Sequence, residues 1–198
     1  MNLKRMRDRL NTLKAITRAS DRTGWMVDDV AFLLYTLVKF YRPSLVIQIG
    51  HLWGKSAVVI LEALQDAFLY ETALETGRLS GDPEFLAFTQ EQTPPRERGR
   101  LISVDAYPYG NWRDGIAYLQ GCYEGFEFVV TTSEQFWESR VFPDEGFILG
   151  IVDGDHSYEG CRADILGMHR IGAGLIVVDD TLWIEDIDRA CRDCAAET

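Results

Sequence analysis

Residues 147–181, FILGIVDGDHSYEGCRADILGMHRIGAGLIVVDDT, decide the fold of this chain. Two short runs in this stretch, 147–152 and 174–178, are almost continuously apolar, and a stretch with helical character, 158–171, separates them. Strands that are apolar on both faces are typical of a parallel sheet that helices cover on each side. The stretch therefore predicts a strand, a helix and a second strand of one parallel sheet.

The same alternation extends toward the N-terminus. Further apolar runs of this kind, again with helical stretches between them, occur at 45–49, 100–104 and 126–130. This alternation predicts an α/β fold, namely a doubly wound and mainly parallel sheet. The pattern of residues 1–42 predicts two helices. We expect these to form an N-terminal helical extension that serves as a dimer contact or a substrate lid. Residues 43–198 form the ligand-binding domain, in which 76–98, rich in glycine, proline and charge, predicts an inserted surface loop.

Composition narrows the class of protein. A chain of 198 residues with 46% hydrophobic and 26% charged residues is ordinary for one globular domain. Lys and Arg number 20 against 31 Asp and Glu, a net charge of −11, which disfavours nucleic-acid binding. No apolar run is long enough for a membrane span, and the charged N-terminus does not fit a secretory signal. We therefore expect a cytoplasmic protein, and the four cysteines do not predict a disulfide framework.

Small and polar residues follow every predicted strand. In doubly wound sheets, ligands bind at the carboxyl ends of the strands. The segments that follow the five strands, in chain order, are 50–56, 105, 131–134, 153–156 and 179–181. Together they predict one binding cleft. Aromatic residues of these loops are candidates for lining an acceptor pocket, namely Trp25, Trp53, Tyr107, Tyr109, Trp112 and Trp183.

Four aspartates follow the fourth and fifth strands, Asp153, Asp155, Asp179 and Asp180. Like charges at such spacing repel, so either some are protonated or a cation lies among them. Carboxylates with open water positions suit a hard divalent cation such as Mg²⁺. The alternative is that the acids splay apart and cap helices. His156, beside this cluster, is a candidate general base or a partner that orients one.

The turn after the first strand carries a second signal. Gly50 and Gly54 permit a tight turn before a helix that Ser56 is placed to cap. The spacing G-x-x-x-G differs from the dinucleotide pattern, which disfavours a nucleotide-dependent dehydrogenase. Asp105 ends the second strand, where an acid accepts hydrogen bonds from ribose hydroxyls.

These strand-end residues, in this order, resemble the class I S-adenosylmethionine-dependent methyltransferases. The stretches LVIQIGHLWGKSAVVILEAL and IVDGDHSYEGCRADILGMHRIGAGLIVVDDT are similar to the metal-dependent small-molecule O-methyltransferases. That group includes catechol-type enzymes and the sugar or macrolide O-methyltransferases of antibiotic pathways. The resemblance covers about residues 24–185, and D-G-D-H-S-Y-E-G followed by D-D-T is its more specific part.

The resemblance implies two cofactors, S-adenosylmethionine and Mg²⁺ or a similar divalent cation. The residues that would bind S-adenosylmethionine are Gln48, Gly50, Gly54, Ser56, Asp105, Ser133, Glu134 and Asp153. Among them, Gly50, Gly54 and Ser56 would hold the methionine part, Asp105 the ribose, and Ser133 and Glu134 the adenine. The metal would be bound by Asp153, Asp179 and Asp180, and the catalytic residues would be Asp155 or His156 as the base, beside Asp153.

The implied activity is Mg²⁺-assisted O-methyl transfer to a small hydroxylated acceptor, a natural product, sugar or phenol. The expected assembly is a homodimer or a higher homo-oligomer, with no nucleic-acid or membrane partner.

Two features differ from the family pattern. The family usually has an acid at the position of Gln48, and two further strands usually follow the fifth, whereas 181–198 is enough for one helix. Whether the chain is truncated or shortened, the sheet is expected to lack its last two strands and to expose the fifth at an edge. These differences leave alternatives open: an enzyme on the same scaffold that needs no metal or performs another reaction such as hydroxylation, or a cofactor-binding or assembly subunit without catalysis.

Overall fold

The computed structural model describes residues 3–18, 28–75, 99–108, 110–142 and 146–197. Its strands are β1 (Leu45–Ile49), β2 (Arg100–Val104), β3 (Phe126–Val129), β4 (Ile148–Val152) and β5 (Ala173–Val178). They form one sheet in the order β3-β2-β1-β4-β5, and every pair of neighbours is parallel. The prediction of a doubly wound parallel sheet is confirmed, with strand bounds within one residue of those expected.

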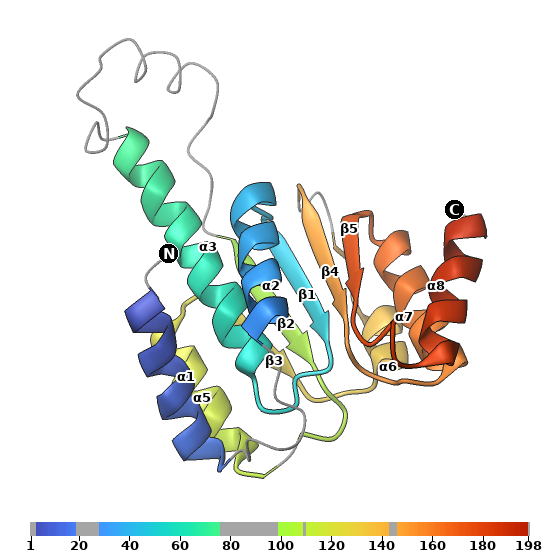
Figure 1. Cartoon of the computed structure of the whole chain (residues 1–198), viewed down its shortest axis with the longest axis horizontal. Helices are drawn as coiled ribbons and strands as arrows, with labels where there is room; N and C mark the ends of the chain where they lie inside the picture. The colour runs from blue at the N-terminus through green and yellow to red at the C-terminus, as the bar shows by residue number, and fades with distance from the viewer. Residues whose placement is uncertain (1–2, 19–27, 76–98, 109, 143–145, 198) are drawn as a thin grey trace.

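Helices cover both faces of the sheet (Figure 1). One face carries α1 (Leu3–Thr17), α2 (Asp28–Tyr41), α3 (Lys55–Glu75) and α5 (Trp112–Cys122). The other carries α6 (Ser133–Ser139), α7 (Tyr158–Arg170) and α8 (Glu185–Glu197). Successive residues of β1 therefore point into two separate apolar clusters, Val46 into the first and Leu45 and Ile47 into the second. This explains why β1 and β4 are buried along their whole length and lack a polar face.

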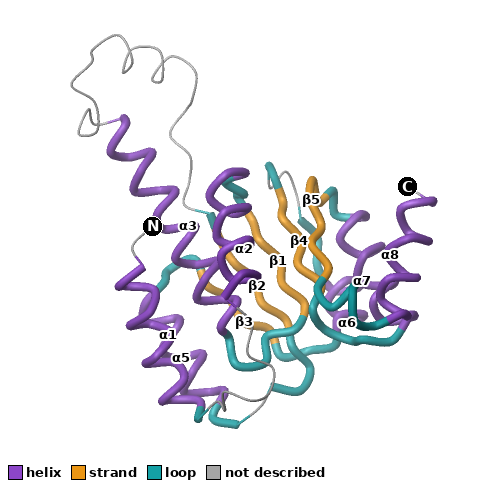
Figure 2. Tube along the Cα trace, in the orientation of Figure 1, coloured by secondary structure: helices purple, strands orange, loops and turns teal. Residues whose placement is uncertain are grey.

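The register of the strands aligns their carboxyl ends. Ile49 pairs with Val104 of β2 and with Val152 of β4, so all three strands end at one level. The hydrogen bonds continue one residue further, because the Asp153 N–H donates to the Ile49 carbonyl at 2.9 Å. The loops that follow the strands consequently gather along one edge of the sheet (Figure 2).

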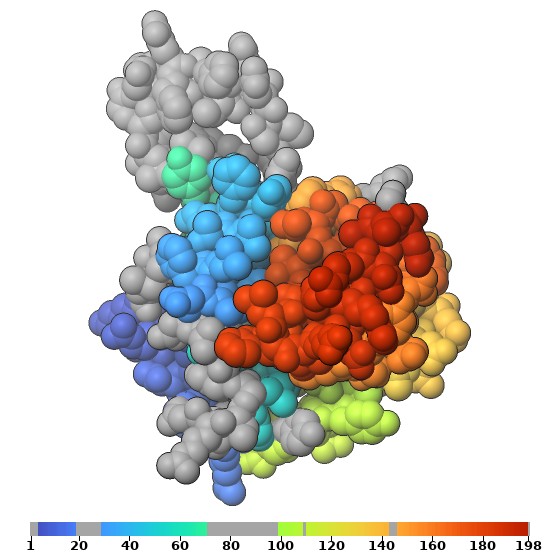
Figure 3. Space-filling view, turned by 45° about the vertical axis from the view of Figure 1, so that its right-hand side comes forward, coloured from blue at the N-terminus to red at the C-terminus, as the bar shows by residue number. Residues whose placement is uncertain are grey.

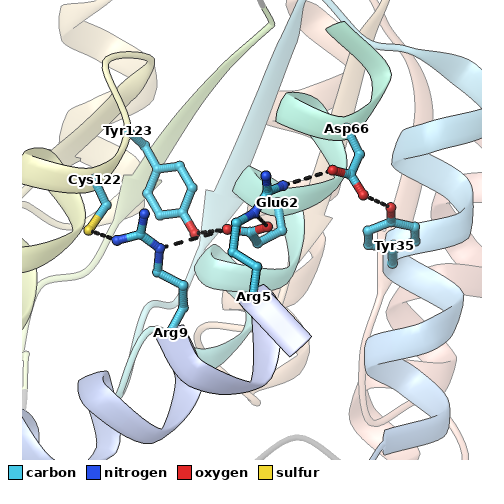
Figure 4. A network of polar contacts seen from close by, with 7 residues as sticks. All are labelled: Arg5, Arg9, Tyr35, Glu62, Asp66, Cys122 and Tyr123. Carbon is cyan, nitrogen blue, oxygen red and sulfur yellow. Dashed lines mark hydrogen bonds and ion pairs between the residues drawn. The ribbon is translucent and has the colours of Figure 1, made fainter. Parts of the chain in front are cut away.

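A polar network attaches α1 to the body of the protein (Figure 4). Arg5 donates to Glu62 at 2.5 Å and to Asp66 at 2.7 Å, both on α3. The Tyr123 hydroxyl donates to Glu62 at 2.6 Å, and the Tyr35 hydroxyl donates to Asp66 at 2.5 Å. Glu62 is only 1% exposed, so its charge is compensated inside the protein rather than by water. The roles predicted for 1–42, a dimer contact or a lid, stay predictions.

The strand β5 lies at the edge of the sheet, as expected, and its apolar residues are only half-buried. The block formed by α7, α8 and the segment after β5 comes forward in Figure 3. In that segment Leu182 and Trp183 are 90% and 85% exposed. The described part of the chain has no sixth strand, and none of its helices is long and apolar enough to cross a membrane. The predicted loop at 76–98 lies outside the described residues.

Candidate functional site

A cavity of about 830 Å³ opens at the carboxyl ends of the strands. Residues that follow each of the five strands line it, which confirms that the polar strand ends share one cleft. The volume lies in the upper part of the range usual for small-molecule sites. Of the aromatic residues expected there, Trp53, Tyr107 and Trp183 line the cavity. Trp112 packs against Phe128 instead, with ring centroids 5.8 Å apart, and Trp25 and Tyr109 lie outside the described residues.

The glycine turn after β1 is shaped by backbone conformations that other residues rarely adopt. Gly50 has φ +89° and Gly54 has φ +76°. A Cβ atom on Gly50 would overlap the backbone carbonyl of Asp153, and one on Gly54 would lie 2.8 Å from the His51 ring. Both positions therefore require glycine, for conformation and for space.

Asp105 closes this turn onto β2. Its Oδ2 accepts hydrogen bonds from the backbone N–H groups of His51 and Leu52, both at 3.0 Å. Its Oδ1 accepts from the Tyr107 N–H at 2.8 Å. A carboxylate has about four acceptor sites, so Asp105, which lines the cavity, keeps capacity for a ligand hydroxyl. Its bonding to the glycine turn was not anticipated from sequence.

His51 is buried beneath the turn. Its Nδ1 lies 2.9 Å from the Ser103 hydroxyl, and its ring centroid lies 4.7 Å from that of Phe128. Burial lowers the pKa of His51 to about 4, against the opposing charge of Asp105. The imidazole is therefore neutral near pH 7 and supports the turn rather than exchanging protons.

Gln48 lies beneath the cavity and is not one of the residues that line it. Its Nε2 donates to the Gly50 carbonyl and to the Ser56 hydroxyl, both at 2.6 Å. Its Oε1 is buried without a hydrogen-bond donor among the described residues. Because an unpaired buried acceptor is costly, this orphaned oxygen fits a bound molecule that carries an N–H group.

Three side chains at the ends of β4 and β5 approach one another. The ligand-type atoms of Asp153, His156 and Asp180 all lie within 4.8 Å of each other. The His156 Nε2 lies 3.9 Å from the Asp153 carboxylate and 3.6 Å from that of Asp180. Asp180 has φ +58°, a left-handed conformation that is uncommon outside glycine and is enriched at functional sites.

The other two aspartates line the cavity but bind backbone groups. The Asp179 carboxylate accepts from the Asp180 N–H at 2.9 Å, and the Asp155 carboxylate accepts from the Ser157 N–H at 2.9 Å, just before α7. The three side chains whose ligand-type atoms lie close together are therefore Asp153, His156 and Asp180. His156 stands where the sequence suggested Asp179 as a metal ligand. The alternative in which an acid caps a helix does not hold for Asp155, because the cap of α7 is Ser157, whose hydroxyl accepts from the Gly160 N–H at 3.1 Å.

The crowding of carboxylates changes the acidity of Asp153. Burial, followed by the charges of Asp179, Asp180 and Asp105, raises the pKa of Asp153 to about 7. A cation at this point would relieve the repulsion and favour the ionised form.

The two residues of α6 that were expected to lie by the adenine differ in position. Ser133 lines the cavity, whereas Glu134 does not. Thr132 also lines the cavity, and its hydroxyl caps α6 by accepting from the Gln135 N–H at 3.3 Å.

The sequence reasoning missed one residue that lines the cavity and one buried acid that does not. Lys55, the first residue of α3, is 6% exposed and lines the cavity. The signal was its position between Gly54 and Ser56, directly after the glycine turn. Asp164 is fully buried on α7, and its carboxylate accepts from the Trp137 indole at 3.2 Å. Its signal was an acid between Cys161 and Ile165, on the apolar face of the helix.

Comparison with solved structures supports the fold, whereas comparison by sequence identifies no family. No family model matches the chain, and no curated protein matches it. Among solved structures, cofactor-bound Rv0187 from MTB aligns with a TM-score of 0.63 at 18% identity, over 95% of this chain and 76% of that one. An O-methyltransferase from Bacillus cereus in complex with SAH aligns with a TM-score of 0.66 at 12% identity, over 99% and 80%. The SAH-bound Podospora anserina methyltransferase PaMTH1 aligns with a TM-score of 0.64 at 11% identity, over 96% and 78%.

The chain therefore has the fold of the class I S-adenosylmethionine-dependent methyltransferases, as its strand-end residues suggested.

Proposed function

We propose that this protein is an S-adenosylmethionine-dependent methyltransferase that methylates a hydroxyl of a small molecule with the help of a divalent cation. One observation carries the proposal: a single cavity joins the glycine turn and Asp105 to the group of Asp153, His156 and Asp180. The similar structures determined with SAH support the choice of cofactor. The acceptor is a phenol, a sugar or another small natural product. The cytoplasmic location and the homo-oligomeric state remain predictions.

The residues of the first half of the cavity fit the cofactor. Gly50 and Ser56 would hold its methionine part, Asp105 its ribose hydroxyls and Ser133 its adenine. The free acceptor capacity of Asp105 suits a hydroxyl, and the orphaned Oε1 of Gln48 suits an amino group.

The residues of the second half fit a divalent cation. Asp153 and Asp180 would bind it, and Asp179 would join them if its carboxylate turned away from the Asp180 N–H. Carboxylates with water at the remaining positions favour Mg²⁺ or Mn²⁺. The proposed ligands are thus the three carboxylates suggested by the sequence, and His156 lies 3.6 Å from that of Asp180.

In this proposal His156 accepts the proton of the acceptor hydroxyl. Its ring is half-exposed, and its Nε2 lies 3.9 Å from the Asp153 carboxylate and 3.6 Å from that of Asp180, within the group that faces the acceptor. The bound cofactor would supply an activated methyl group, and the cation would lower the pKa of the hydroxyl, which is near 10 in a free phenol. Tyr107 and Trp183, at the rim, would hold the acceptor in line with the methyl group, and such alignment lowers the barrier by several kcal/mol.

The test combines binding and turnover. We expect SAH to bind with one-to-one stoichiometry in calorimetry, and excess chelator to abolish methyl transfer to a panel of phenols and sugars. Asp180→Asn should weaken Mn²⁺ binding and lower turnover by about a hundredfold or more. His156→Gln should lower turnover by a similar factor while Mn²⁺ affinity stays within about threefold.

A matched control is Asp114→Asn, because Asp114 is an exposed acid on α5 outside the cavity. Loss of Mn²⁺ binding in His156→Gln would make His156 a metal ligand instead of the base. Activity that persists in chelator would favour the metal-independent enzyme. Binding of SAH without turnover of any acceptor would favour the cofactor-binding subunit, which the neutral Gln48 first suggested.

A further inference from the structure

The helices α7 and α8 pack side by side, and three of the four cysteines of the chain lie on them (Figure 1). Cys161 lies on α7, and Cys191 and Cys194 lie on α8. All three contribute to the apolar cluster on this face of the sheet. Cys161 is 1% exposed, whereas Cys191 is partly exposed. None of the three lines the cavity, so the proposed function gives them no role.

Polar contacts on either side of Cys161 fix how α7 lies against α8. The Tyr158 hydroxyl donates to the Asp193 carboxylate at 2.7 Å. Arg162 donates to both carboxylate oxygens of Glu197, at 2.8 and 2.6 Å. Because Cys161 lies between Tyr158 and Arg162 on the same helix, it is held opposite the part of α8 that carries the other two cysteines.

The thiols of Cys161 and Cys191 meet across this helix interface. Cys161 donates its hydrogen to the Cys191 sulfur. Neighbouring thiols are the precondition for a disulfide, in which the sulfur atoms lie about 2.05 Å apart. The pair therefore offers a place where a covalent bond could join the two helices.

The environment gives the two thiols different roles. Burial, followed by the neighbouring Cys191, Asp164 and Cys194, raises the pKa of Cys161 to about 12, so this thiol keeps its proton. Burial also raises the pKa of Cys191, but the hydrogen bond from Cys161 opposes that rise. Because the thiolate is the reactive form, the partly exposed Cys191 is the thiol that meets an oxidant first.

We propose that Cys161 and Cys191 form a reversible disulfide, which joins α7 to α8 when the protein meets a hydroperoxide. In a reducing compartment such a bond is transient, and the dithiol is the resting state. The inference is independent of the proposed function, because no residue that lines the cavity takes part in it.

The chemistry has two steps. The Cys191 thiolate attacks a peroxide oxygen, which forms an S–O bond, breaks the O–O bond and leaves a sulfenic acid and hydroxide. The Cys161 sulfur then attacks the Cys191 sulfur, which forms the S–S bond, breaks the S–O bond and releases water together with the Cys161 proton. Two thiols are thus oxidised to one disulfide, and hydrogen peroxide is reduced to two molecules of water.

The disulfide would enclose the edge strand. Cys161 precedes β5 and Cys191 follows it, so the bond closes a loop of the chain that contains β5. A cross-link of this kind constrains the unfolded chain more than the folded one. For a loop of about 30 residues we expect the Tm of the oxidised protein to lie about 5–10 °C above that of the reduced protein.

The first experiment maps the bond in the unmodified protein. The protein is treated with stoichiometric hydrogen peroxide, its remaining thiols are alkylated under denaturing conditions, and it is digested with trypsin without reductant. Trypsin cuts after lysine and arginine, so each cysteine lies on its own peptide: Cys122 on 114–140, Cys161 on 141–162, Cys191 on 190–192 and Cys194 on 193–198.

Mass spectrometry should find peptide 141–162 joined to peptide 190–192, with the loss of two hydrogen atoms, and dithiothreitol should separate them. A main product that joins 193–198 to either of the other two peptides would overturn the inference. Complete alkylation of Cys161 in the oxidised sample would overturn it as well, because that thiol would then not have entered a disulfide.

The second experiment compares the Tm of oxidised and reduced protein for each variant, so that an effect of the substitution itself cancels. Cys191→Ser replaces the partly exposed thiol and should abolish both the link and the rise in Tm. The matched control is Cys122→Ser, because Cys122 lies on α5 at the other face of the sheet and should leave both unchanged. A rise in Tm that persists in Cys191→Ser, or is lost in Cys122→Ser, would overturn the inference.

Discussion

At the scale of single residues, the crowded position of Asp153 makes the stability of the folded protein depend on pH. It follows β4 and lies among other acids, so burial and its neighbours raise its pKa to about 7. In the unfolded chain the same carboxyl loses its proton near pH 4. The folded state therefore holds a proton that the unfolded state has released between about pH 4 and 7. The contribution of Asp153 to stability is present below pH 4 and falls as the pH rises to about 7.

We expect Asp153→Asn to raise the free energy of unfolding at pH 8 in chelator by about 1–2 kcal/mol. This is less than the full pKa difference implies, because the Asp153 side chain is 34% exposed and water screens its charge. At pH 4 the gain should be close to zero, and at any pH the variant should bind Mn²⁺ poorly. Urea unfolding at both pH values measures the effect. A lower free energy of unfolding for Asp153→Asn at pH 8 would contradict the view that the neighbouring carboxylates repel Asp153 when no metal is bound.

At the scale of secondary-structure elements, the attachment of α1 affects the site. Arg5 links α1 to Glu62 and Asp66 of α3, and Leu13, further along α1, is buried against the glycine turn. A Cβ on Gly54 would lie 3.4 Å from Leu13. The network and the apolar contact together hold α1 against the helix that begins at Lys55.

We expect Arg5→Met to lower the free energy of unfolding by about 2 kcal/mol, because it leaves the buried Glu62 and the partly buried Asp66 without their closest cationic partner. Hydrogen exchange should accelerate in α1, and SAH should bind severalfold more weakly. The control is Arg7→Met, since Arg7 is exposed on the same helix. Equal stability of the two variants would show that the network does not hold α1.

At the scale of the whole molecule, the cavity exists only when the sheet is formed. Its walls come from the ends of all five strands, which lie up to about 130 positions apart along the chain, from Gly50 to Asp180. A cofactor that binds there binds the folded state and has no site in the unfolded one. Its binding must therefore stabilise the protein as a unit.

We expect SAH at a hundred times its Kd to add about 2.7 kcal/mol to the free energy of unfolding. For a chain of this size that corresponds to a rise in Tm of about 5–10 °C, measurable by calorimetric melting. A nicotinamide dinucleotide at the same concentration should leave Tm unchanged, because the glycine spacing does not fit a pyrophosphate. A larger shift with the dinucleotide would contradict the proposed cofactor.

The sequence by itself determined the sheet and the location of the cleft. Almost continuously apolar runs such as 45–49 and 147–152 are typical of strands that helices cover on both faces, and β1 and β4 are buried along their whole length. Parallel strands bring their carboxyl ends to one edge, so polar residues that directly follow them must share a site. That is why Asp105, Asp153 and Asp180 were predicted to share a cleft from their positions alone.

Only the tertiary structure decided what each polar side chain faces. Asp155 and Asp179 bind nearby backbone N–H groups, while Asp153, His156 and Asp180 converge. This choice depends on side-chain rotamers and on backbone angles such as φ +58° at Asp180, which residue order does not specify. The bonds from Asp105 to the glycine turn and the burial of Lys55 in the cavity likewise arise from contacts between elements far apart in the chain, and the roles of these residues follow from those contacts.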